Sequence, residues 1–340
     1  YQNQGLSFSD LINEGNMDLV KPASKTDVST LADYVHTFGQ DAKLRYGERV
    51  HKIAIDAAFT CPNRDGSKGR GGCSFCNNAS FSPNGLKPSP VAEQIESGRR
   101  VIRKRTGANR YIAYFQAYTN TYADIEYLRS LYDEALSYPD VAGLSVGTRP
   151  DCVPDEVMKL LAGYQEQGFE VWLELGLQSS FDDTLLEVNR GHDYADYCRA
   201  VSSAHRYGLQ VCTHLMAGLP GEGRAHVITT LQRVLDQGVA GLKIHPLHVV
   251  RGTRLANDWR RGSYNPLLLD DYVETVCDMI AITPENIPYH RLTGTASGHL
   301  LLAPDWCSRK WLVLNTIKNR IIQRGIRQGS ALPAAESVQV

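Results

Sequence analysis

Six short apolar segments recur along the chain, and stretches with helical spacing separate them. The segments cover residues 51–58, 110–117, 141–148, 170–177, 209–217 and 240–247. Between them lie stretches such as 124–136 and 153–168, whose apolar residues recur every three or four positions. After the first interval the repeat is about 30 to 40 residues, which is typical of right-handed βαβ units in a parallel sheet. Six such units form either an open doubly wound sheet or a partly closed barrel.

The alternation of side chains within the segments favours the barrel. One face of residues 170–178 is entirely apolar, whereas the other face carries Glu174 and Gln178. The strands of a doubly wound sheet are usually apolar on both faces. His214, Lys243 and His245 repeat the asymmetry in the last two segments. Each could be a core residue with its own partner, but together they predict a partial (β/α)6 TIM-like barrel with a site at its mouth.

The composition is that of a globular protein with an ample core. Hydrophobic residues make up 42% and charged residues 21% of the 340 positions. We expect an N-terminal extension over residues 1–40, a core barrel over 41–255 and a helical C-terminal extension over 256–340. No apolar run approaches the roughly 20 residues that a membrane span needs. Five cysteines are scattered singly, which predicts a cytoplasmic protein without a disulfide framework: Cys152, Cys198, Cys212, Cys277 and Cys307.

The net charge of −1 gives no overall attraction for a polyanion. Basic residues do cluster at 99–105 and again between Lys310 and Arg327. Either cluster could be a solvated helix face or a stripe that follows the phosphates of an RNA. Both interpretations stay open at this point.

Three cysteines lie in one glycine-rich loop directly after the first apolar segment. Cys61, Cys73 and Cys76 have the spacing C-x11-C-x2-C, with four glycines between the first two. Thiolates suit either zinc or an iron–sulfur cluster. Zinc needs a fourth ligand, and His51 stands at the wrong end of the strand to supply it. Three cysteines on a [4Fe–4S] cluster leave one iron open for a substrate or cofactor.

Two other groups of possible ligands have ordinary explanations. His245 and His248 are three residues apart around a proline, which is poor spacing for a shared metal. Cys307 could relay electrons, but a buried structural cysteine is the simpler interpretation.

The loop and several further motifs resemble the radical S-adenosylmethionine (SAM) enzymes. Residues 73–76 read CSFC, which matches the C-x-aromatic-C of that family, although the spacer of eleven is longer than usual. FQAYTNTYA, VGTRPDC, LELGLQS, NRGHDY and HLMAGLPGE extend the resemblance over about residues 36–330. Among these enzymes, the chain is most similar to the YhcC/YtqA-type branch, which is related to the catalytic subunit of Elongator.

The resemblance assigns roles to particular residues. It implies that the three cysteines hold a [4Fe–4S] cluster and that Phe75 borders the adenine of SAM. Residues 116–120 stand where the family binds the methionine amino group, and Arg190 is the implied partner of the carboxylate. The other implied SAM or substrate contacts are Gln116, Thr119, Asn120, Glu174, Gln178, His214 and the turn that begins at Gly218.

The resemblance also implies a reaction. A reduced cluster cleaves SAM to a 5′-deoxyadenosyl radical, which abstracts hydrogen from the substrate, so an electron donor such as flavodoxin or ferredoxin is expected. Relatives in this branch and in Elongator act on the position-5 side chain of wobble uridine in tRNA, which we expect here too. The alternatives are a radical enzyme for a small metabolite or a protein, and a non-catalytic zinc–thiolate module.

Overall fold

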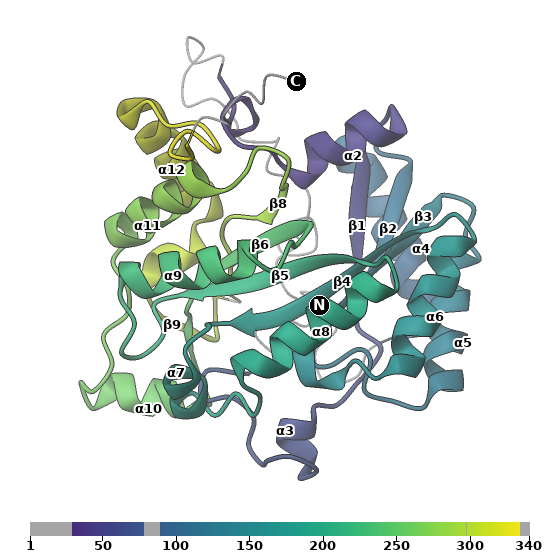
Figure 1. Cartoon of the computed structure of the whole chain (residues 1–340), viewed down its shortest axis with the longest axis horizontal. Coiled ribbons are helices and arrows are strands. Elements are labelled where there is room, and N and C mark those ends of the chain that lie inside the picture. Colours follow the sequence, from purple (N-terminus) through teal and green to yellow (C-terminus); the bar gives the residue numbers. More distant parts are fainter. Residues whose placement is uncertain (1–28, 78–88, 297, 334–340) are drawn as a thin grey trace, which may run out of the picture.

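Seven parallel strands form one curled sheet, a half-barrel that confirms the predicted architecture (Figure 1). The computed structural model describes residues 29–77, 89–296 and 298–333. The strand order is β1-β2-β3-β4-β5-β6-β8, so each strand neighbours the next along the chain. The strands are β1 (Val50–Ile55), β2 (Arg110–Phe115), β3 (Val141–Thr148), β4 (Glu170–Gln178), β5 (Gln210–Ala217), β6 (Gly241–Pro246) and β8 (Tyr289–Arg291).

Helices pack on the outer face of the sheet because each strand alternates between two environments. In β4, Leu173 and Leu175 belong to the large core that includes the helices, whereas Trp172 belongs to a smaller core inside the barrel. The longer helices are α4 (Val91–Thr106), α5 (Ile125–Leu136), α6 (Asp155–Glu166), α8 (Tyr194–Arg206), α9 (Arg224–Leu235), α11 (Leu269–Ile282) and α12 (Lys310–Arg324). None of the described helices is long and apolar enough to cross a membrane.

Shorter elements occupy the connections. The helices α3 (Pro62–Asp65), α7 (Asp182–Glu187) and α10 (Arg254–Arg260) lie along one edge of the molecule (Figure 1). Strands β7 (Val249–Val250) and β9 (Leu301–Ala303) form a separate antiparallel pair. Single 3₁₀ turns complete the set: η2 (Leu31–Asp33), η4 (Pro150–Cys152) and η5 (Asp305–Ser308).

Helix α2 (Phe38–Tyr46) closes the end of the barrel at which the strands begin. Phe38 is fully buried, and its ring lies 4.4 Å from the His290 ring and 5.9 Å from the Trp172 ring. The predicted boundary between residues 40 and 41 therefore falls inside a helix that belongs to the barrel. Among the residues that the structure describes, α2 thus covers this end, and the opposite end, where the strands finish, is the one that a ligand can reach.

The C-terminal part contributes to the sheet as well as to the helices. The predicted boundary between residues 255 and 256 falls inside α10. β8, which lies in the predicted helical extension, pairs with β6 and completes the half-barrel. The sequence did not predict this strand, because three residues are too few to display alternation.

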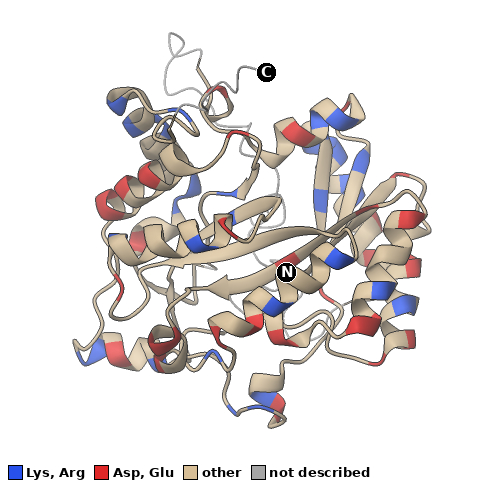
Figure 2. Ribbon diagram, viewed as in Figure 1, with Lys and Arg blue, Asp and Glu red and all other residues tan. Residues whose placement is uncertain are grey.

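In the described structure, the basic cluster on α12 is largely paired within the fold. Lys318 is 1% exposed, and its Nζ donates to the Ser29 carbonyl at 3.3 Å. Arg324 pairs with Glu274 at 2.7 Å and Asp278 at 2.8 Å on α11. Figure 2 shows this acidic helix beside the basic one. The positive charges of α12 are used within the fold.

The basic cluster on α4 faces away from the mouth of the barrel. Arg99 pairs with Asp140 at 2.7 Å, while Arg103 and Lys104 are exposed. These residues lie in the last turns of the helix, which leads into the start of β2. They therefore lie at the closed end of the barrel.

Candidate active site

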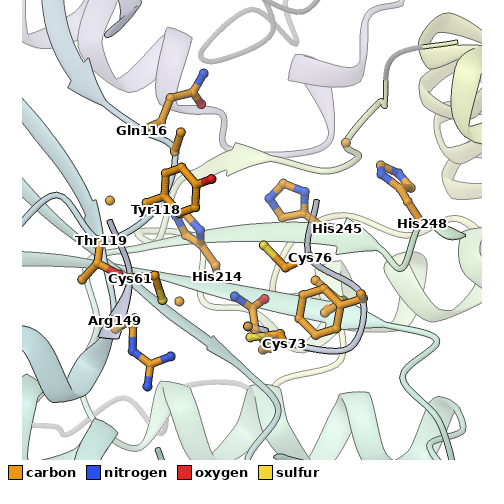
Figure 3. A pocket seen from close by; sticks show the side chains of 18 of the residues that line it. Cys61, Cys73, Cys76, Gln116, Tyr118, Thr119, Arg149, His214, His245 and His248 are labelled. Atoms are coloured by element: carbon orange, nitrogen blue, oxygen red, sulfur yellow. The ribbon is translucent and has the colours of Figure 1, made fainter. Parts of the chain in front are cut away.

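A cavity at the carboxyl ends of the strands brings the three loop cysteines together with residues from the other strand ends. Cys61, Cys73 and Cys76 line it, and Figure 3 shows them around a common space with Gln116 and His214 nearby. In parallel barrels this end carries the active site, because the connecting loops converge there. The structure thus places the cysteine loop where the sequence predicted.

Neighbouring segments fix the course of the cysteine loop. Inside the loop, the Gly72 amide donates to the Asn63 carbonyl at 2.8 Å. Across to the segment after α7, the Ser74 amide donates to the Val188 carbonyl at 2.9 Å, and the Asn63 side chain donates to the Asn189 carbonyl at 2.5 Å. The loop is therefore held by backbone hydrogen bonds before any metal is considered.

An ion pair between the half-exposed Lys68 and the buried Asp151 ties the same loop to the segment that follows β3. Lys68 donates to Asp151 at 2.5 Å, and Arg149 binds the same carboxylate through two nitrogens at 2.9 Å. Burial raises the pKa of Asp151, but its hydrogen bonds with Arg149 and Lys68 lower it to about 2. Arg149 also donates to the Arg190 carbonyl at 2.7 Å. Arg149 was not among the predicted site residues, although its place directly after a strand was an available signal.

Backbone strain concentrates at this end of the barrel. Five described non-glycine residues have positive φ, which costs about 1–3 kcal/mol each unless the surroundings enforce it. They follow β1, β2 and α7 or end β4: Ala58, Ala117, Tyr118, Gln178 and Asn189. Ala117, Tyr118 and Gln178 line the cavity. Such strain is characteristic of functional sites.

Several polar atoms in the wall of the cavity are buried without a hydrogen-bond partner in the described structure, and three of them belong to residues that the sequence singled out. These three are Thr119 Oγ1, Asn120 Oδ1 and Arg190 Nε. Leaving such a group unsatisfied costs about 1–3 kcal/mol, so each is suited to a ligand. All three residues were predicted SAM contacts.

The sulfur atoms also have donors nearby. Arg190 Nη1 lies 3.5 Å and Asn63 Nδ2 3.9 Å from Cys73 Sγ. Burial and the neighbouring Cys73 raise the pKa of Cys76 to about 11, while Arg64 opposes this shift. Hydrogen bonds and positive charge around sulfur stabilise thiolates and tune the potential of iron–sulfur clusters.

The arrangement of donor atoms does not match a single zinc ion. A Zn–S length of about 2.3 Å puts two tetrahedral thiolates about 3.8 Å apart. Among the described residues, only Glu174, Cys212 and His290 form a His/Cys/acid trio with ligand atoms within 4.8 Å of one another. The three loop cysteines are more widely spaced, as a larger cluster requires.

Glu174 lies beneath the cavity, not on its wall. Its carboxylate accepts hydrogen bonds from four side chains: Lys52 at 2.6 Å, Ser145 at 2.5 Å, Lys243 at 2.5 Å and His214 Nε2 at 2.7 Å. Although burial raises the pKa of Glu174, the Lys243 and Lys52 ammonium groups hold it well below its usual range. The structure therefore does not support the predicted contact of Glu174 with SAM, because other side chains already occupy both oxygens. The same ion pairs also exclude Glu174 as a metal ligand.

The floor of the cavity separates this ion cluster from a ligand. Lys243 Nζ lies 4.0 Å and Lys52 Nζ 5.2 Å from the centroid of the Tyr114 ring. Tyr114 and His214 both line the cavity above the cluster. His214 therefore links the cavity to the charges below it.

The far wall of the cavity carries His245, His248 and Arg291. His245 Nδ1 lies 3.4 Å from Arg291 Nη1, and its ring centroid is 6.0 Å from that of His214. Burial lowers the pKa of His248 to about 4, so its imidazole is neutral near pH 7. His248 Nε2 is buried without a partner in the described structure. No sequence signal indicated Arg291, since it ends a strand of three residues.

The remaining predicted contacts divide into two groups. Phe75, Gln116 and Gln178 line the cavity, as predicted for ligand-binding residues. Gly218 does not: its carbonyl accepts from Tyr264 at 2.7 Å, and a side chain there would meet Leu267 at 3.3 Å. The position of Gly218 is set by packing, and its predicted contact with adenine or substrate is corrected.

The fold and the cysteine site together define a radical SAM protein, and comparison with known families agrees. Residues 64–234 match the Radical SAM superfamily model, and residues 239–323 match its C-terminal domain model. The chain belongs to the Radical SAM superfamily.

Particular relatives narrow this placement. The chain is 48% identical over 302 residues to protein YhcC of Escherichia coli K12, covering 89% of this chain and 96% of that protein. YtqA of Bacillus subtilis 168 is 39% identical over 295 residues, or 86% and 91% of the two chains. The fold is similar to the solved Elp3 of Methanocaldococcus infernus, with a TM-score of 0.58 and 18% identity over 82% of this chain and 64% of that chain.

The superfamily implies a [4Fe–4S] cluster and SAM, and the residues present fit both. Three spaced thiols suit the cluster. The partnerless Arg190 Nε is a hydrogen-bond donor, Asn120 Oδ1 is an acceptor and the Thr119 hydroxyl can be either. These atoms suit the amino and carboxylate groups at the methionine end of SAM.

We expect Glu174→Ala to destabilise the fold, because two buried ammonium groups lose their counterion. Breaking a buried ion pair in this way costs about 3–5 kcal/mol. Urea unfolding of the cluster-free protein measures the loss. Glu166→Ala on the exposed end of α6 is the matched control, and Lys52→Met, Glu174→Leu and Lys243→Met combined should recover most of the stability. Unchanged unfolding of Glu174→Ala contradicts this role.

Arg190→Gln should weaken SAM binding roughly 10- to 150-fold, since a charge-assisted hydrogen bond contributes about 1.5–3 kcal/mol. Calorimetric titration of the reconstituted protein with SAM gives the dissociation constant. Arg199→Gln, at a surface position with 67% of its side chain exposed, should bind normally. Normal affinity of Arg190→Gln, at equal iron content, removes Arg190 from the SAM site.

Proposed function

We propose that this protein is a radical SAM enzyme that modifies the position-5 side chain of wobble uridine in tRNA. The observation that carries the enzyme class is the convergence on one cavity of three cysteines with the partnerless polar atoms of Thr119, Asn120 and Arg190, among others. The resemblance to the Elongator catalytic subunit supports the tRNA substrate. We favour a radical step on a substituent that the uridine already carries.

When bound, the cluster and SAM supply one-electron cleavage and a carbon radical that takes hydrogen from the substrate. The chain's own residues provide the binding geometry. Arg190 presents Nε to the methionine carboxylate, while residues 116–120 border the methionine end. The closed barrel bottom and the Tyr114 ring exclude water from beneath the reacting atoms.

The wall formed by His245, His248 and Arg291 is suited to the substrate. A guanidinium binds a carboxylate through two parallel hydrogen bonds, so Arg291 fits an acidic uridine substituent. The neutral His248 can donate to or accept from a nucleobase edge. These residues lie on β6 and β8 and the segment between β6 and β7, beyond the predicted SAM contacts.

A small metabolite or a protein is the second candidate substrate, and the charge distribution favours it. The positive charges of α12 are paired within the fold, and the exposed cations of α4 lie at the closed end. The described cations of α12 and α4 therefore give no direct support for an RNA at the mouth. A small anionic substrate needs only Arg291 and the histidines.

Anaerobic reconstitution should give about four irons per chain, as expected for one [4Fe–4S] cluster. Reduction with dithionite should then yield 5′-deoxyadenosine from SAM. Cys61→Ala, Cys73→Ala and Cys76→Ala should each abolish the product and lower the iron content. Cys198→Ala and Cys277→Ala are the matched controls, since both side chains pack in the hydrophobic core. Stoichiometric zinc and no cleavage in the wild type contradict the proposal.

Cells that lack the protein should accumulate tRNA with an unprocessed wobble-uridine substituent. Mass spectrometry of nucleosides from bulk tRNA detects it. The wild-type gene and Cys198→Ala should restore the normal profile, whereas Cys73→Ala should not. An unchanged profile in the deletion strain rejects tRNA and favours the small-metabolite or protein substrate.

A further inference from the structure

The cysteine loop has a second face, and a groove lies against it. Arg64, Gly72, Cys73 and Cys76 line both this groove and the active-site cavity. The loop is therefore a wall between two hollows. A molecule in the groove can approach the cysteines without entering the cavity.

The groove is strongly cationic. Arg64, Arg70 and Arg254 line it, and within the described chain no Asp or Glu does. Arg70 is exposed, and the Arg254 side chain is 58% exposed, with Asp258 4.0 Å away. Arg64 donates to the Cys76 carbonyl at 2.5 Å, so one of these charges lies directly on the loop. A partner for this face must carry negative charge.

Glycines, which have no side chain, form part of the lining of the groove. Gly71, Gly72 and Gly252 have φ of +83°, +77° and +81°, a conformation that favours glycine. At Gly71 no atom lies within 4 Å of the position that a Cβ would take, whereas the Arg64 side chain lies against Gly72. A flat group that projects from a partner can therefore come close to the loop.

The proposed function requires one electron for each SAM cleaved, and this inference rests on it. SAM and substrate fill the cavity during turnover, so the reductant must approach from elsewhere. The groove offers that approach, since Cys73 and Cys76 are part of its lining.

We propose that the groove is the docking surface of an acidic flavodoxin, which reduces the cluster held by the three cysteines. The donor flavin in its hydroquinone state loses one electron, and the oxidised cluster gains it, so the step is balanced without another reactant. The arginines attract the acidic carrier and orient its flavin edge. Electron-transfer complexes have small, weak interfaces, which suits a groove of this kind.

An RNA backbone is the competing occupant, and the lining disfavours it. No aromatic side chain lines the groove in the described structure, whereas single-stranded RNA sites combine cations with aromatic stacking. A substrate base must also enter the cavity, which lies on the other face of the loop.

The test compares Arg70→Glu/Arg254→Glu with wild type in two independent measurements. Calorimetric binding of purified oxidised flavodoxin at low salt should weaken at least tenfold in the variant, and wild-type affinity should fall as salt is raised. Cleavage of SAM driven by dithionite, which needs no docking, should be unchanged. The matched control is Arg103→Glu/Lys104→Glu at the closed end of the barrel, which should resemble wild type in both.

Equal flavodoxin affinity of variant and wild type overturns the proposal. So does a variant that loses tRNA affinity in a gel-shift assay while keeping flavodoxin affinity, because the groove is then an RNA site. Loss of iron or of dithionite-driven cleavage in the variant also overturns it, since the arginines then serve the loop itself. If dithionite fails to drive cleavage in wild type, the proposed function fails, whereas flavodoxin binding still decides the docking surface.

Discussion

A single buried carboxylate organises the interior of the barrel. Glu174 on β4 accepts from Lys52 on β1 and Lys243 on β6, and from side chains on β3 and β5, all away from water. Taking these charges out of solvent is costly unless each has partners in good geometry. The strands must therefore curl until their inner faces meet at this residue. Curling at this point defines the floor of the cavity and places His214 above it.

The two ends of the barrel differ. Side chains fill the end where the strands begin, whereas the backbone is strained at the end where they finish. Phe38 packs against aromatic rings where the strands begin, which leaves the opposite end as the one that a ligand can reach in the described structure. There the backbone adopts positive φ at residues such as Tyr118 and Gln178. The dense hydrogen bonding of the cysteine loop and the Arg149–Asp151 pair maintain these conformations. The rigid cysteine loop and this ion pair therefore support the strained backbone beside them. Together they keep the polar wall of the cavity in place.

The distribution of positive charge illustrates how folding changes the meaning of a sequence pattern. Arg320 and Arg324 on α12 are matched by acids on α11, which lie about 50 residues earlier in the chain. Arg64, Arg70 and Arg254 come from separate segments, yet they line one groove. A run of basic residues on a helix is therefore weaker evidence for an anionic partner than dispersed residues that the fold assembles.

The sequence by itself determined the architecture and the place of the three-thiol candidate site. Periodicity gave six of the seven strands, and spacing gave the thiol loop at the mouth, because both signals are local. The motifs also identified Thr119, Asn120 and Arg190, whose polar atoms the structure leaves for a ligand. Tertiary structure decided the rest. Glu174 was predicted to contact SAM, but it lies in a buried ion cluster, because Lys52 and Lys243, which are distant in sequence, both pair with it. Which atoms are buried, paired or left open depends on contacts between distant segments, and a linear pattern does not contain them.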